Sequence, residues 1–137
     1  MLHWVSFFCL FAIASVSPMD SADAQEDIIE GAWQQIESNA GACAKCHILV
    51  APKGEALSVV ANNGWSAVVS IQPMKEPLEA MGTGMWAPGR IGTAAGRPCS
   101  VVFRLIRQRL YMSMRVDMED GSRRQINAVF GRVWFGA

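Results

Sequence analysis

The sequence predicts a mainly β fold, an antiparallel up-and-down meander of eight strands that closes into a barrel. Three observations support this: apolar and polar residues alternate with period two, turn signals separate the alternating segments, and each segment follows closely on the last. Alternation places successive side chains on opposite faces of a strand, so that one face can be buried. Closure is expected because it removes the exposed edges that a flat meander would leave.

The clearest element is a hairpin from Leu110 to Phe135. Apolar residues occupy every second position from Leu110 to Met118, and Asp120-Gly121 supplies a turn because both residues tolerate positive φ. The returning strand places alternate residues on one face: Ile126, Ala128, Phe130, Arg132 and Trp134. The C-terminal half is therefore expected to be sheet.

The remaining strands are predicted from the same signals. Asn62-Asn63-Gly64 is a strong hairpin signal between two apolar segments. The eight expected strands are centred near Trp33, Ile48, Val59, Val68, Thr83, Phe103, Met114 and Phe130. Short turns join consecutive strands, which favours antiparallel neighbours.

The segment 26–38 is ambiguous. Ile28, Ala32 and Ile36 are spaced four apart, as on a helix face. Gly31 argues against one long helix, and the residues from Ala32 onward could equally begin a strand after a short helical turn. We therefore expect a short N-terminal helix before the first strand.

The N-terminus predicts export. The apolar run Trp4–Val16 is too short to span a bilayer, and Ala22-Asp23-Ala24 fits a signal-peptidase cleavage site. Residues 1–24 are thus expected to be a signal peptide and residues 25–137 a single periplasmic or secreted domain. Membrane contact is expected only through an uncleaved signal.

Charge is unevenly distributed along the expected mature chain. Residues 25–89 hold three lysines and seven acids, whereas residues 90–137 hold nine arginines and three acids. A solvated arginine-rich sheet face explains this more simply than an anionic partner. Few aromatic residues alternate with the arginines, so nucleic-acid binding is not expected.

Two features together resemble the lipocalin-like (calycin) barrels. Those proteins carry Gly-x-Trp at the start of the first strand, and Gly31-Ala32-Trp33 here follows the expected helical turn at residues 27–30. They also carry an arginine late in the last strand that packs across this tryptophan, and Arg132 matches it by position. The chain is closer in size to the bacterial secreted protease inhibitors, which use a similar small barrel.

The resemblance implies a binding module with no catalytic residues, whose partner is a small apolar ligand inside the barrel or an exported protein. The residues expected to form the ligand cavity are Trp33, Trp65, Met81, Met85, Met112, Met114, Phe130 and Arg132. Methionines can adapt to an apolar ligand, although at sheet spacing they more often pack one another as core. His47 is the single histidine after the signal, so no other histidine base is available for catalysis.

The motif Cys43-x-x-Cys46-His47 supports an alternative. It is the pattern of covalent haem attachment, and with a helix over 26–42 it would resemble the small cytochromes c used in electron transfer. The second axial ligand would then be Met74, Met81 or Met85. The hairpins after the motif argue against that family.

The simpler expectation for the motif is no cofactor and a disulfide from Cys43 or Cys46 to Cys99 in an oxidising compartment. Only three cysteines and one histidine remain after the signal, so a structural zinc site is less favoured, and no metal is expected.

Overall fold

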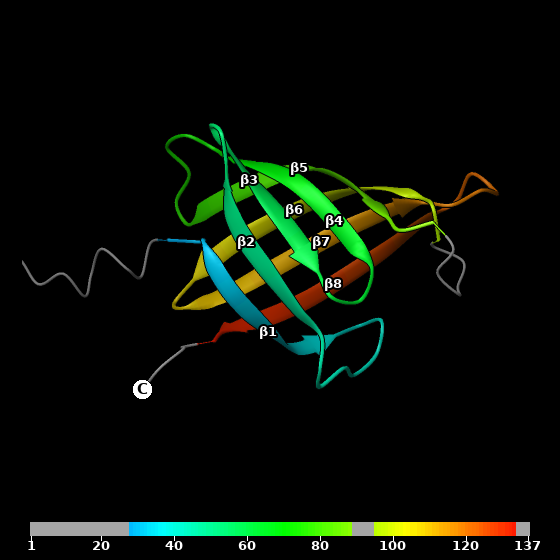
Figure 1. The fold of residues 1–137 in the computed structure, drawn as a ribbon, viewed down its shortest axis with the longest axis horizontal. Helices are drawn as coiled ribbons and strands as arrows, with labels where there is room; N and C mark the ends of the chain where they lie inside the picture. Colours follow the sequence, from blue (N-terminus) through cyan, green and yellow to red (C-terminus); the bar gives the residue numbers. More distant parts are fainter. Residues whose placement is uncertain (1–27, 89–94, 134–137) are drawn as a thin grey trace, which may run out of the picture.

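Eight antiparallel strands close into a barrel in which each strand pairs with the next and β1 pairs with β8 (Figure 1). This computed structural model describes residues 28–88 and 95–133. The strands are β1 (Gly31–Ser38), β2 (His47–Lys53), β3 (Ala56–Ala61), β4 (Trp65–Ile71), β5 (Leu78–Trp86), β6 (Pro98–Ile106), β7 (Arg109–Asp117) and β8 (Arg123–Arg132). All eight predicted centres fall inside a strand, so the predicted fold class is confirmed.

The predicted helix does not appear among the described residues. Residues 28–30 have no regular secondary structure and β1 starts at Gly31, so the longer helix over 26–42 is wrong where the structure describes it. The rest of the expected helical turn, the signal peptide 1–24 and Trp134 lie outside the described residues. No helix in the described part is long and apolar enough to cross a membrane.

The β7–β8 hairpin follows the predicted alternation. Leu110, Met112, Met114 and Val116 are buried, while the residues between them on β7 are exposed. Gly121 has φ 83° in the turn between the strands, and its amide donates to the carbonyl of Met118 at 3.1 Å. The hairpin therefore supplies one wall of the core through alternate side chains.

The seam between β1 and β8 is where the barrel closes, and Figure 1 shows these first and last strands side by side. Their register shifts between Gln35 and Glu37, a β-bulge that interrupts the alternation of β1. Beyond the bulge, the side chain of Asn39 accepts from the Asn127 amide at 2.9 Å and donates to the Gln125 carbonyl at 3.1 Å. These bonds extend the pairing past the end of β1.

Strand β5 carries two inward glycines that allow very close approach to β4. A Cβ atom at Gly82 would lie 1.9 Å from the Val68 carbonyl oxygen, and one at Gly84 would lie 2.0 Å from that of Ser66. Glycine in a strand marks a sharp bend or a close backbone contact. The two glycines thus let the sheet curve tightly enough to close at β4 and β5.

Candidate ligand-binding site

The two ends of the barrel are built differently. At one end β1 leads into the loop 39–46, β3 turns into β4 at residues 62–64, and Trp86 ends β5. At the other end Trp33, near the start of β1, lies beside the end of β8. We term the first the mouth and the second the closed end.

At the closed end, Trp33 is fully buried and its Nε1–H donates to the Ile29 carbonyl at 2.8 Å. The guanidinium carbon of Arg132 lies 4.1 Å from the centroid of the Trp33 ring, which is a cation–π contact. Arg132 also donates to the backbone carbonyls of Glu30 and Ile28. Burial lowers the pKa of Arg132, but a guanidinium remains charged in proteins. The predicted Trp33–Arg132 contact is confirmed.

The mouth opens into a cavity of about 160 Å³ between the inner faces of the strands, and its wall combines apolar side chains with the polar residues Gln35, Ser38, His47 and Asn63. Its inner wall includes Trp65, Met112, Met114 and Phe130, four of the residues expected to form a ligand cavity. The exposed residues 40–42 and the half-buried Asn63 lie at its rim. The cavity therefore faces solvent at the mouth and the apolar core within.

The remaining expected cavity residues lie elsewhere. Met81 and Met85 are 42% and 50% exposed on the outer face of β5, so their predicted place in the interior is wrong. The inward residues of β5 are Leu78, Ala80, the two glycines and Trp86. Trp33 and Arg132 do not line the cavity but close the opposite end.

Trp86 is a cavity residue that the sequence prediction missed. It lies opposite Trp65 in the β4–β5 register, and both tryptophans line the cavity. Its Nε1 atom is buried and has no hydrogen-bond partner among the described residues. Its phase with the buried Ala80 could have indicated an inward position, but the intervening glycines make that face look too small for a core.

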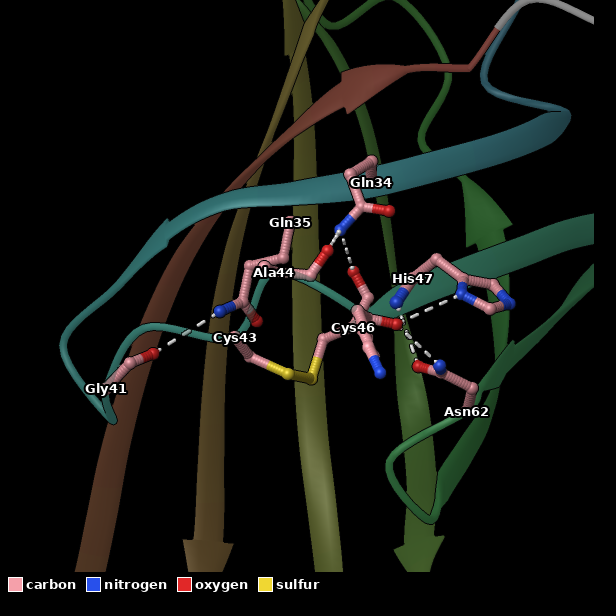
Figure 2. The surroundings of a disulfide bond; sticks show 9 residues. Gln34, Gln35, Gly41, Cys43, Ala44, Cys46, His47 and Asn62 are labelled. Carbon is pink, nitrogen blue, oxygen red and sulfur yellow. Dashed lines mark hydrogen bonds between the residues drawn. A yellow bond between two sulfur atoms is a disulfide. The ribbon is translucent and has the colours of Figure 1, made fainter.

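The loop 39–46 is held against the barrel by a disulfide and by side-chain amides (Figure 2). The Gln34 side chain on β1 donates to the carbonyls of Ala44 and Cys46, both at 2.9 Å. Across the loop, Asn62 donates to the Lys45 carbonyl at 2.7 Å and accepts from the His47 amide at 2.8 Å. The loop 39–46 thus forms a constrained rim around the mouth.

The disulfide joins Cys43 to Cys46, and Cys99 is a free, buried thiol. The predicted bridge to Cys99 is therefore wrong. The Cα atoms of Cys43 and Cys46 are 5.4 Å apart, a common separation for a disulfide, so the short loop brings the two sulfurs together by itself. Cys99 faces the barrel interior between Gly84 of β5 and Val116 of β7.

The Cys43-x-x-Cys46-His47 residues do not fit a covalent haem in this arrangement. Both sulfurs are bonded to each other, and β1 occupies the place of the helix that a cytochrome c would need. Cys46 is buried whereas the His47 ring is exposed and points away from the sulfurs (Figure 2). Two thioethers and an axial histidine must instead meet one haem.

The electrostatics of the cavity are neutral. The described residues lining it include no Asp, Glu, Lys or Arg. No three His, Cys, Asp or Glu side chains gather as a metal site anywhere in the described ranges. The apolar inner wall can therefore accommodate an uncharged molecule, because that part of the wall carries no group that would compensate a buried charge.

A second, wider hollow of about 650 Å³ lies on the outer surface over β6, β7 and β8 and the end of β1. Its polar side chains include Glu37, Arg104 and Asn127, and Tyr111 contributes a half-exposed ring. Arg104 is also paired with Glu79 at 3.0 Å. This is an open, mixed surface of the kind that a protein can contact.

Searches of protein-family models, curated proteins and solved structures found no match to this chain. The closed, eight-stranded, up-and-down β-barrel is compatible with a lipocalin-like fold.

Proposed function

We propose that this protein is an exported, lipocalin-like binding module that takes a small apolar molecule into the cavity at the mouth of its barrel. The observation that carries the proposal is a cavity with an apolar inner wall behind a constrained rim, in a barrel whose opposite end is closed by Trp33 and Arg132. An eight-stranded barrel of this kind has an interior just wide enough for side chains or one small ligand.

Two further observations support a binding role without catalysis. The cavity wall is formed mostly by side chains with no acid–base chemistry, as in sites that bind by exclusion of water. His47 lines the cavity, where its ring is exposed and its Nδ1 atom is 3.3 Å from the Lys45 carbonyl oxygen. For the cellular location, we propose the periplasm or the exterior, which agrees with a chain that holds a disulfide.

The test uses ¹⁹F NMR with fluorobenzene as the apolar probe. Ala128 is a buried residue on the cavity wall, so Ala128→Leu should fill the space and weaken fluorobenzene binding at least fivefold. Its neighbour Asn127 is exposed on the outer face, so the matched variant Asn127→Leu should bind as the wild type does. Absence of binding to the wild-type protein, or equal loss in both variants, would contradict the proposal. Native mass spectrometry of protein from its own host can then identify a natural ligand.

The outer hollow favours a second candidate, binding of an exported protein partner, in the manner of a small-barrel protease inhibitor. Tyr111 is the exposed aromatic residue within it, and aromatic residues are enriched at protein interfaces. Pull-down from the protein's own secretome, followed by assay of captured proteases, tests this candidate. Tyr111→Ala should reduce capture, whereas Ser66→Ala on the outer face of β4 should not.

A further inference from the structure

We infer that the Cys43–Cys46 disulfide is redox-active and exchanges reversibly with a small thiol at the mouth of the barrel. This activity goes beyond the proposed function, because the exchange requires no ligand in the cavity. Ligand binding gives the Cys-x-x-Cys pair no chemistry of its own, although the bridge lies at the rim of the mouth. A disulfide exchanges with thiols when one of its sulfurs can be approached, which depends on its surroundings in the fold.

The two cysteines differ in their access to solvent. Cys46 is buried, with 8% of its surface exposed, whereas Cys43 is half-buried and lies between the exposed residues Ala42 and Ala44. Both cysteines line the cavity, so the bridge borders the space that opens at the mouth. That space is about 160 Å³, close to the roughly 150 Å³ that accommodates a benzene ring, so it admits a small thiol. The incoming thiolate should therefore attack Cys43 and displace Cys46.

The reaction is a two-electron exchange. A thiolate RS⁻ attacks Sγ of Cys43, the bond between the two cysteine sulfurs breaks, and its electron pair leaves on Sγ of Cys46. A second RS⁻ attacks the R sulfur of the mixed disulfide, so that RS–SR forms and the Cys43 thiolate is released. The protons lost by the two RSH molecules end on the two cysteines. Two thiols are thus oxidised to RS–SR while the bridge is reduced, and RS–SR restores the bridge by the reverse steps.

The loop that carries both sulfurs is fixed by contacts that do not involve the bridge. Gln34 donates to the carbonyls of Ala44 and Cys46, both at 2.9 Å, and Asn62 donates to the Lys45 carbonyl at 2.7 Å (Figure 2). These bonds can persist after reduction, so the two thiols should stay close enough to form the bridge again. The bridge spans a sequence separation of only 3, so its loss frees little of the unfolded chain and the reduced barrel should stay folded.

The loop carries positive charge where the thiolates form. Residues 39–46 include no Asp or Glu, and Lys45 lies between the two cysteines in the sequence. A nearby cation stabilises a thiolate, which is both the form that attacks and the form that leaves. Lys45 should therefore favour exchange in both directions.

The first test is reduction of the folded, mature Cys99→Ala protein by 2-mercaptoethanol, with free thiols counted by mass after alkylation. Cys99 is buried and does not line the cavity, so its replacement leaves only the loop thiols to count. The rate of reduction should change by less than about twofold in about 1 M urea, whereas reaction through the unfolded state would accelerate about fivefold or more. The tryptophan fluorescence of the reduced protein should remain that of the folded state. Acceleration by urea, unfolding on reduction, or no reduction of the folded protein would overturn the inference.

The second test identifies the sulfur that is attacked. In the Cys99→Ala background, Cys46→Ser leaves the Cys43 thiol and Cys43→Ser leaves the Cys46 thiol. Each folded variant is mixed with 2-hydroxyethyl disulfide, and formation of the mixed disulfide is followed by mass. The Cys43 thiol should react about tenfold faster or more, because Cys46 is buried. Equal rates, or a faster Cys46, would overturn the assignment of Cys43. Fluorobenzene binding is measured independently of both tests, so failure of the exchange and failure of the proposed function are distinguishable.

Discussion

Gly84, like Gly82, is a residue at which the fold has no room for a side chain. A Cβ atom there would lie 2.0 Å from the Ser66 carbonyl oxygen and 2.8 Å from both Cα and Cβ of Ala67, atoms that belong mainly to the neighbouring backbone. Rotamer changes cannot relieve such a contact, so β4 and β5 would have to separate. The glycine is required by closeness and not by an unusual φ.

Gly84→Ala should therefore lower the free energy of unfolding by at least about 3 kcal/mol, the upper range for overpacking. Thr83 lies next to it and faces outward, so Thr83→Ala is the matched control and should cost less than about 1 kcal/mol. Urea denaturation followed by tryptophan fluorescence measures both. Equal effects of the two substitutions would show that the close approach of β4 and β5 is not a real constraint.

Cys99 is the one free thiol among the described residues, and burial raises its pKa, an effect only partly offset by a hydrogen bond from the Gly84 backbone. A raised pKa in the folded state stabilises the fold fully below the ordinary thiol value of 9.0. That contribution is lost as pH rises through the folded pKa.

Wild-type protein should therefore lose more stability than Cys99→Ala as the pH rises above the ordinary thiol value of 9.0, because the pKa of the folded-state thiol is raised. The difference between the two proteins isolates the Cys99 thiol, because the proteins share every other titratable group. Urea unfolding midpoints below and above this value provide the measurement. Parallel pH profiles would mean that the Cys99 thiol does not titrate differently on folding.

At the scale of single residues, the sequence predicted inward positions correctly wherever the inward residues were the larger ones. Leu110, Met112 and Phe130 are examples, and all three are buried. It failed on β5, where the inward face carries glycines and the outward face carries Met81 and Met85. Hydrophobicity alone assigns methionine to the core, whereas the short distance between β4 and β5 reverses the assignment.

At the scale of elements, the strands were predictable because most of them alternate between a buried and an exposed face. The first was ambiguous because of the bulge between Gln35 and Glu37, which adds a residue and breaks the period of two. Ile36 is consequently 48% exposed, although its spacing from Ala32 suggested a helix face. A bulge depends on the partner strand, so one strand's sequence does not indicate it.

The loop 39–46 carries the prediction that best separates a disulfide from a haem site. Protein produced in a host competent for haem attachment should be colourless, without a Soret band, and alkylation of the unfolded mature chain should find one free thiol. In the double variant Cys43→Ser, Cys46→Ser, the free energy of unfolding should fall by about 2 kcal/mol, since closing a four-residue loop removes little entropy from the unfolded chain. Cys99→Ser serves as the control for cysteine number and should leave the loop intact. A covalent mass increase of one haem would overturn this assignment.

At the scale of the whole molecule, closure into a barrel was predictable from the number and spacing of the strands, but the difference between its two ends was only half predictable. The closed end depends on Trp33 and Arg132. The sequence indicates both residues, through the Gly-x-Trp pattern at residues 31–33 and the arginine late in the last strand. The mouth depends on where the strands β4, β5, β7 and β8 place Trp65, Trp86, Met114 and Ile126, which come from distant parts of the chain. These four side chains meet at the mouth because of the register between neighbouring strands around the whole barrel.

The separation of the two ends predicts that stability and ligand binding can be changed independently. Arg132→Met removes the cation–π contact and the two hydrogen bonds to the Glu30 and Ile28 carbonyls, so it should lower the free energy of unfolding by about 2 kcal/mol. Arg132→Lys keeps the charge but not the planar fork of donors, and it should recover only part of the loss. Neither residue change touches the cavity wall, so fluorobenzene affinity at 25 °C should stay within about twofold of wild type, a difference of about 0.4 kcal/mol. Urea denaturation measures the free energy of unfolding, and ¹⁹F NMR on the same samples measures fluorobenzene affinity. If folded Arg132→Met lost affinity in parallel with its loss of stability, the closed end and the mouth would be coupled.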